Sequence, residues 1–232
     1  WWIYLMEKLK MFKQGILEEL PLQLGVFPFG IVYGVMAIEG GLNFLQSFLL
    51  SSIIFGGASQ IVFIQLISSF TPAGIIISSV GAINSRHFLY GMSIMPYLRE
   101  LSLTWRVVLA YLLTDEAYAI SIKKFTNDPN NSFLHYHLLG TGITLFITWQ
   151  ISTLTGILLG KHLPEFIDLQ FIIPLTFIAI VMPMISSISI LMAALSSGFS
   201  ALIFNNLDLN LWIILSALIG LIVGIATSRF DK

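Results

Sequence analysis

Residues 42–97 read LNFLQSFLLSSIIFGGASQIVFIQLISSFTPAGIIISSVGAINSRHFLYGMSIMPY, and this stretch decides the fold. It is long enough for two membrane-spanning helices, because a helix needs about 20 apolar residues to cross a bilayer. The segment Ser68-Ser69-Phe70-Thr71-Pro72 predicts the turn between them. Arg86 carries the only formal charge in the stretch at neutral pH. An unpaired arginine at mid-membrane costs about 3 kcal/mol or more, so we expect Arg86 to have a partner on another helix.

The composition of the whole chain predicts a polytopic membrane protein. Hydrophobic residues make up 56% and charged residues 10% of the 232 residues, and the mean hydropathy is +0.90. A soluble domain carries about 25% charged residues. The net charge of −1 gives no reason to expect a nucleic-acid partner. Because cysteine is absent, disulfides, thiol catalysis and thiolate metal sites are excluded.

Charged and turn residues divide the chain into about eight predicted helical spans. They cover Leu20 to Ile38, two spans in Leu42 to Tyr97, Trp105 to Ile122, Leu138 to Gly160, two spans in Leu169 to Leu207, and Leu209 to Ser228. The alternative is seven spans with a re-entrant hairpin over Ser47 to Phe70. No linker is long enough to separate two domains. We therefore expect an all-α helix bundle in the lipid bilayer, with residues 1–232 as one integral membrane domain.

The distribution of lysine and arginine predicts the orientation of the bundle. With eight spans and a cytoplasmic N-terminus, both termini lie inside, and the larger group of basic residues lies inside with them. No cleavable signal is recognisable, so we expect the first span to remain in the mature protein. The expected cytoplasmic residues are Lys8, Lys10, Lys13, Lys123, Lys124, Arg229 and Lys232, and the expected outer residues are Arg99, Arg106 and Lys161.

A polar cluster lies near the middle of the third predicted span. Within one helix, Arg86 and Tyr90 share a face, and Asn84 and His87 share the face beside it. Two adjacent polar faces at this depth indicate a helix that faces protein or water rather than lipid. No acidic residue lies one helical turn from Arg86, so the neutralising carboxylate has to come from another helix.

Asp115 and Glu116 interrupt the fourth predicted span and are the candidate partners. At 1.5 Å per residue, Arg86 and these acids lie roughly 20 to 25 Å from the turn near Leu101, so their depths match in antiparallel neighbours. We predict that Arg86 pairs with one of the two acids. The other acid then remains for an amine or a proton. The alternative is an ion pair that only fixes the register of two helices.

The segment Phe55-Gly56-Gly57-Ala58-Ser59-Gln60 predicts a break in the second span. Paired glycines disfavour a continuous helix, and transporters use such breaks to aim free backbone N–H and C=O groups at a substrate. A break at this depth is tolerable where it lines a cavity. The alternative is a close helix crossing, with the serine bonded back to its own helix.

Four motifs together resemble the AzlC family in order and spacing. They are Pro28-Phe29-Gly30, Phe55-Gly56-Gly57-Ala58-Ser59-Gln60, Asn84-Ser85-Arg86-His87-Phe88-Leu89-Tyr90-Gly91 and Leu113-Thr114-Asp115-Glu116. The resemblance covers the first half of the chain strongly and the rest only in hydrophobic pattern. It implies the large subunit of a two-subunit permease in the bacterial inner membrane, not an enzyme. The implied function is export of leucine, isoleucine and valine, with methionine as a further candidate, and the implied partner is a small membrane subunit of the AzlD type.

An amino-acid zwitterion needs a cationic contact, an anionic or carbonyl contact and an apolar pocket. Arg86 or the N–H groups freed near Ala58 can supply the first, Asp115 or Glu116 the second, and the surroundings of Phe55 and Phe63 the third. The candidate substrate-binding residues are Gly57, Ala58, Ser59, Gln60, Asn84, Arg86 and Tyr90, and the candidate coupling or gating residues are His87, Asp115 and Glu116.

We expect no cofactor. The chain has no Gly-x-x-x-x-Gly-Lys-Ser/Thr element for nucleotide binding and no His-Glu-x-x-His element for a catalytic metal. Coupling to protons, through His87 or the surplus acid, is the expected energy source. A channel-type pore and a structural membrane subunit with a polar helix-pairing core are the alternative functions. A saturable flux favours a carrier over a pore.

Overall fold

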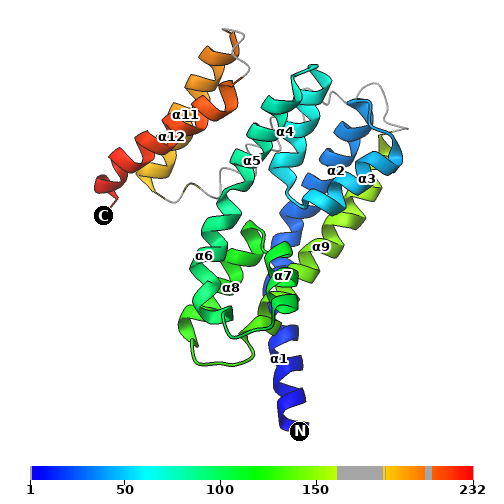
Figure 1. Ribbon diagram of the computed structural model, residues 1–232, viewed down its shortest axis with the longest axis vertical. Coiled ribbons are helices and arrows are strands. Elements are labelled where there is room, and N and C mark those ends of the chain that lie inside the picture. The colour runs from blue at the N-terminus through cyan, green and yellow to red at the C-terminus, as the bar shows by residue number, and fades with distance from the viewer. Residues whose placement is uncertain (1, 161–184, 186, 207–210, 232) are drawn as a thin grey trace. The chain divides into compact units, whose positions relative to one another are not determined.

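The computed structural model describes residues 2–160, 185, 187–206 and 211–231 (Figure 1). Every regular element in these residues is helical, which confirms the all-α prediction. They belong to two compact units, one within Trp1–Gln65 and Ile83–Leu163, the other within Leu66–Ala82 and Pro164–Lys232. The first of the two spans predicted in Leu169 to Leu207 lies outside the described residues, and the single-domain assignment stays a prediction.

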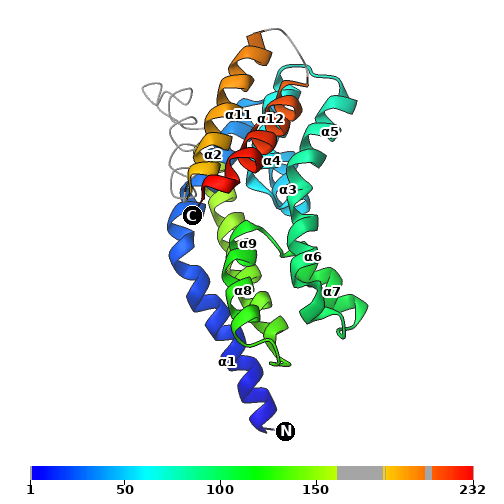
Figure 2. The same cartoon turned by 90° about the vertical axis from the view of Figure 1, so that its left-hand side faces the viewer.

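Three helical segments form the long axis of the first unit. Helix α1 (Trp2–Glu19) passes through the short helix η1 (Leu20–Leu22) into α2 (Gln23–Glu39), and α9 (Leu134–Leu159) runs beside both (Figures 1 and 2). Glycines bring these backbones together. A Cβ added to Gly34 of α2 would lie 2.7 Å from the backbone nitrogen of Ile157 in α9. The helices therefore pack at a distance that larger side chains would prevent.

The second, third and fourth predicted spans are each divided into two shorter helices. The pairs are α3 (Phe44–Ile54) with α4 (Gly57–Ser68), α5 (Ala73–Asn84) with α6 (Arg86–Leu98), and α7 (Leu103–Tyr111) with α8 (Asp115–Asn127). The breaks before Gly57 and before Asp115 confirm the predictions. The third span was expected to be one helix, and the structure divides it at Ser85. Serine hydroxyls compete for backbone hydrogen bonds and so favour helix ends, a preference that the apolar pattern hid.

Four described segments are long and apolar enough to cross a membrane. They are Tyr4–Glu39, Leu134–Leu159, Ile188–Asn205 and Trp212–Phe230. The divided spans fall short of that length because each of their helices covers about half a bilayer. The count of seven or eight spans therefore stays a prediction.

The described C-terminal helices form a hairpin in the second unit. Helix α11 (Ile188–Asn206) packs against α12 (Trp212–Thr227), which ends in the short helix η3 (Ser228–Phe230). Gly220 allows the close approach, since a Cβ there would lie 2.8 Å from the Cβ of Ser197. Asp231 joins the two ends of this hairpin, because its Oδ1 accepts a hydrogen bond of 3.0 Å from the backbone N–H of Ser189.

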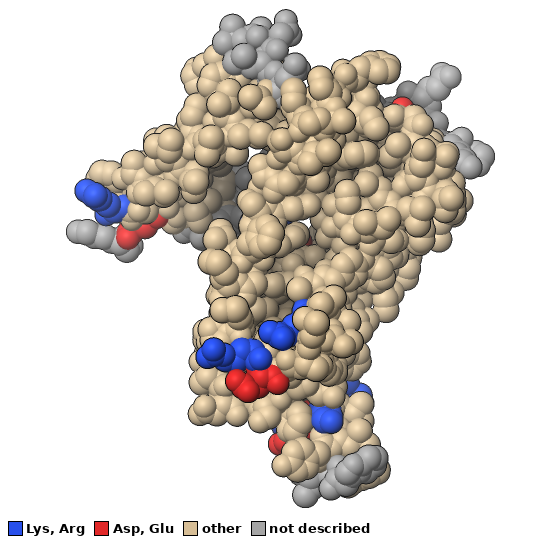
Figure 3. Space-filling view, in the orientation of Figure 1, with Lys and Arg blue, Asp and Glu red and all other residues tan. Residues whose placement is uncertain are grey.

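An apolar cluster holds α6, α7 and α8 against α1 and α9. Its buried members come from these five helices and from the break between α7 and α8: Met11, Ile94, Leu98, Leu109, Leu113, Ala117, Phe125, Leu134 and Leu138. Figure 3 shows the charged side chains on this face of the first unit gathered around α1, α6, α7 and α8, whereas the surface over α2, α3 and α4 is almost free of charge. The uncharged surface suits a lipid environment.

Candidate functional site

The break between α3 and α4 has a left-handed turn at Phe55. This residue has φ 33° and ψ 57°, a conformation that costs a non-glycine residue roughly 1 kcal/mol or more. Its ring is buried and packs 5.2 Å from Phe146 and 5.8 Å from Tyr111 between ring centroids. The aromatic packing therefore holds the backbone in a turn that the glycines beside it permit.

Side chains just beyond this turn satisfy the backbone groups that it frees. Ser59 Oγ donates to the carbonyl oxygen of Gly56 at 2.7 Å, and Gln60 Nε2 donates to that of Leu50 at 3.0 Å. Both side chains are fully buried. Gln60 Oε1 has no hydrogen-bond partner among the described residues. Of the predicted binding residues in this segment, Ser59 is thus engaged with its own backbone and Gln60 keeps a free acceptor.

The first two breaks lie side by side. A Cβ on Gly56 would lie 3.2 Å from Oδ1 of Asn84, the last residue of α5. That oxygen is buried and has no hydrogen-bond partner among the described residues. Gly57, the next residue along, faces the rings of Phe29 and Trp149, and Ala58 is half-buried. The predicted residues of the second and third spans therefore meet at one place.

An ion pair joins the second break to the third. Nη1 of Arg86, the first residue of α6, lies 2.7 Å from Oδ2 of Asp115, the first residue of α8. The prediction that Arg86 pairs with Asp115 or Glu116 is confirmed, and the partner is Asp115. The side chains are 33% and 26% exposed. The pair thus lies in a partly open site rather than in the apolar core.

The ion pair leaves hydrogen-bonding groups of both signs unused. Nε of Arg86 and Oδ1 of Asp115 are buried atoms without a hydrogen-bond partner among the described residues. A carboxylate can accept from the guanidinium, and an ammonium can donate to the free carboxylate oxygen. Each of these atoms can therefore contact a charged group of a small zwitterion once the surrounding side chains move to expose it.

Aromatic and polar side chains of α6 line up beside the ion pair. Tyr90, one turn after Arg86, stacks on Tyr118 of α8 with 4.4 Å between ring centroids. The Tyr118 hydroxyl donates to Ser93 Oγ at 2.9 Å, which fixes α6 against α8. The His87 ring lies 6.0 Å from that of Tyr90, and its Nε2 has no hydrogen-bond partner among the described residues. Arg86, His87 and Tyr90 thus surround the same helix contact.

Comparison with known proteins identifies the family of this chain. A family model with the description "AzlC protein" matches residues 21–163 of the sequence. This stretch contains all three breaks and the ion pair. The chain belongs to the AzlC family. The predicted resemblance is confirmed.

Relatives of this AzlC-family protein are membrane proteins. An uncharacterized membrane protein of Archaeoglobus fulgidus is 30% identical over 220 residues, which is 93% of this chain and 94% of the relative. The inner membrane protein YgaZ of Escherichia coli is 28% identical over 153 residues, 66% of this chain and 62% of the relative. An uncharacterized membrane protein of Helicobacter pylori strain J99 is 25% identical over 180 residues, 75% of each chain. No solved structure matches.

The AzlC-family protein also buries two titratable residues that sequence reasoning missed. Glu19, the last residue of α1, is fully buried. His137 lies in the first turn of α9, fully buried, with Nε2 2.9 Å from Glu18 Oε2. Neighbouring residues of a helix point about 100° apart, so a pair such as Glu18-Glu19 looks like a solvated run until the packing places one of them inside.

Proposed function

We propose that this AzlC-family protein exports branched-chain amino acids as the large subunit of a two-subunit permease. Leucine, isoleucine and valine are the proposed substrates, with methionine as a further candidate. The observation that carries the proposal is the ion pair of Arg86 and Asp115 at the meeting point of three helix breaks. Its unused Nε and Oδ1 match the two charged groups of an amino acid.

The surroundings of the first break suit an aliphatic side chain. Phe55, Phe29 and Trp149 place aromatic rings around the first break, and Phe63 on α4 is half-buried. Apolar lining with a few polar contacts is the general composition of small-molecule sites. The broken helices supply the backbone dipoles that transporters aim at charged substrate groups. These features support a carrier for apolar amino acids.

We also propose an energy source, a partner subunit and a membrane for the transporter. A pH gradient drives the transport, a small membrane subunit of the AzlD type completes the permease, and the protein lies in the bacterial inner membrane with both termini in the cytoplasm. Family membership and the inner-membrane relative support the location. The pair's neighbours His87 and Glu116 are titratable groups that proton coupling can use.

Feeding cells a leucine-containing dipeptide tests the proposal. Peptidases release leucine inside, so cells that lack their own exporters accumulate it. We expect cells that produce this protein with its small subunit to hold severalfold less leucine. The same cells fed an alanine dipeptide are the control and are expected to accumulate alanine equally with and without the protein. Equal leucine accumulation would contradict the exporter function. Export that saturates with leucine concentration would distinguish a carrier from a pore.

A further inference from the structure

Glu19 is the one acidic residue that the described part of the chain buries completely. Its Oε1 accepts a hydrogen bond of 3.0 Å from Gln23 Nε2, and the same amide also donates to the Glu19 backbone carbonyl at 3.2 Å. Its second oxygen, Oε2, is buried and has no hydrogen-bond partner among the described residues. A buried carboxylate with one unpaired oxygen is costly when ionised, and a proton on that oxygen removes the cost.

The neighbouring groups add acceptors rather than donors. Gln23 Oε1 is also buried without a hydrogen-bond partner among the described residues. Helix α8 packs against α1 and carries the half-buried Glu116, whose carboxylate repels that of Glu19 when both are ionised. Two carboxylates that repel each other in an apolar setting ionise together only at high cost. A proton on Oε2 of Glu19 turns that acceptor into a donor and removes the repulsion between the two carboxylates.

Burial and the position along each helix indicate which carboxylate holds the proton. Glu19 is fully buried at a point where α1 continues through η1 into α2, so no free helix N-terminus stabilises a negative charge on it. Glu116 lies in the first turn of α8, where unpaired N–H groups favour one. The carboxylate of Glu19 is therefore the better proton carrier, and that of Glu116 the better anion.

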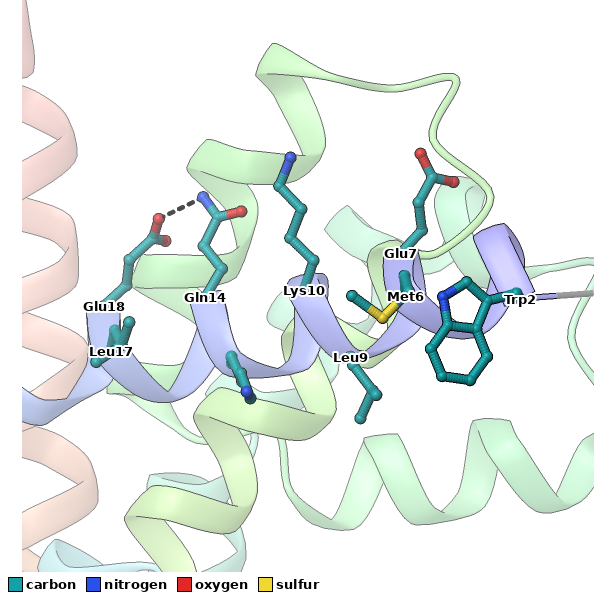
Figure 4. A pocket seen from close by; sticks show the side chains of 9 residues that line it. Trp2, Met6, Glu7, Leu9, Lys10, Gln14, Leu17 and Glu18 are labelled. Atoms are coloured by element: carbon teal, nitrogen blue, oxygen red, sulfur yellow. Dashed lines mark hydrogen bonds between the residues drawn. The ribbon is translucent and has the colours of Figure 1, made fainter.

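The other charged groups nearby are already engaged. Glu18 is exposed along a hollow of about 880 Å³ beside α1, where Gln14 donates to its Oε1 at 2.7 Å (Figure 4). Its Oε2 lies 2.9 Å from Nε2 of His137, a buried residue of α9. The ammonium group of Lys124, on α8, interacts electrostatically with Glu18 and His137. Among the described residues, neither Lys124 nor His137 forms an ion pair with Glu19.

We propose that Glu19 and Glu116 hold one exchangeable proton, carried by Glu19, and that this is the proton-coupling site of the transport cycle. The coupling role rests on the proposed function, whereas the bound proton does not. The site lies one residue along α8 from the Asp115 that pairs with Arg86. Loading of the proton on Glu19 and binding of substrate at Asp115 therefore act on the same helix end.

Infrared spectroscopy of the purified protein tests the bound proton without any transport. A protonated carboxyl group has a C=O absorption that a carboxylate lacks. We expect this absorption at neutral pH, sensitive to carbon-13 labelling of glutamate, absent in Glu19→Gln and retained in Glu7→Gln, an exposed position of the same helix (Figure 4). Persistence of the absorption in Glu19→Gln would overturn the proposal. So would its absence from the labelled wild-type protein, a measurement that does not depend on the folding of any variant.

Transport in proteoliposomes tests the coupling role. We expect Glu19→Gln to keep the exchange of labelled for unlabelled leucine. The rate of uptake driven by a pH gradient should fall at least about tenfold in this variant. Glu7→Gln is expected to keep both. Gradient-driven uptake by Glu19→Gln at the wild-type rate, or wild-type uptake driven by sodium instead of protons, would overturn the coupling role. A wild-type protein without leucine exchange would instead overturn the proposed function, and the infrared result would still decide the proton site.

Discussion

Arg86 and Asp115 are the first residues of two helices, and their side chains meet at 2.7 Å. Each residue therefore lies at a helix N-terminus, where the backbone N–H groups favour negative charge. That placement stabilises Asp115 as a carboxylate and means that Arg86 has to be neutralised by an anion, which in the described structure is Asp115. A substrate carboxylate is such an anion, and the unpaired Nε of Arg86 offers it a donor.

Removal of either member of this ion pair is expected to impair both folding and transport. In Arg86→Ala and Asp115→Asn, one charge remains unpaired near the membrane, which costs up to about 3 kcal/mol. The double variant Arg86→Asp with Asp115→Arg restores a pair but reverses its polarity. We expect it to recover the melting temperature without recovering leucine transport. Recovery of transport as well would support the structural-subunit alternative. Arg99→Ala, at an exposed position, is the control.

Because the chain contains no cysteine, a single introduced cysteine reports the occupancy of the site without background. Ala58→Cys places a thiol at the half-buried start of α4. We expect a small maleimide to modify it, and leucine to slow the modification severalfold. Ser132→Cys, in an exposed position before α9, should be modified at the same rate with and without leucine. A leucine effect of equal size at both positions would argue against a site at Ala58.

Gly57 is expected to tolerate no side chain. A Cβ there would lie 2.5 Å from Phe29 Cε1 and 2.8 Å from Trp149 Cη2, so both rings would have to move. Overpacking of this kind costs about 1–3 kcal/mol, and Gly57→Ala should lower the free energy of unfolding by that amount. Gly25→Ala in α2 is the matched control, because nothing lies within 4 Å of its Cβ. There we expect a gain of roughly 0.5–1 kcal/mol. Thermal melting in detergent measures both, and equal effects would contradict the close packing.

Tyr33 is expected to contribute to stability through its hydroxyl. The side chain is fully buried, and the hydroxyl donates to the backbone carbonyl of Ser47 in α3 at 2.7 Å. Tyr33→Phe leaves that carbonyl without this donor and should cost about 1–3 kcal/mol. Tyr4→Phe, at an exposed position of α1, should cost much less. Similar losses in the two variants would show that the α2–α3 contact does not depend on this hydrogen bond.

Asp231 is expected to make the C-terminal hairpin sensitive to acid. Hydrogen bonds from the side chain and backbone N–H of Ser189 hold the pKa of Asp231 below its ordinary value. The stabilisation of the hairpin by the Asp231 carboxylate is therefore present at neutral pH and is lost as the pH falls through the lowered pKa. Hydrogen exchange at the Ser189 amide should show protection that declines in acid. In Asp231→Asn the protection should be weaker and independent of pH in that range. Unchanged protection in the variant would contradict the role of Asp231.

Much of the fold followed from residues that a membrane helix does not accommodate. Gly56-Gly57 marked the break before α4, and Asp115-Glu116 marked the one before α8. Both segments stand out because glycine pairs and charges are costly inside an apolar helix. The break at Ser85 did not stand out, since a lone serine is tolerated within a membrane helix through a bond to its own backbone. Where a break relies on competition for hydrogen bonds, the local sequence is a weak guide.

The amino-acid sequence predicted a membrane-spanning chain, divided second and fourth spans, and a carboxylate partner for Arg86. The packing of the helices in the tertiary structure was needed to show that this carboxylate is Asp115 and that Glu19 is buried. The physical reason is the same in both cases. Adjacent residues on a helix point in directions about 100° apart, so Asp115 differs from Glu116, and Glu18 from Glu19, only through the rotation that packing imposes on α8 and α1.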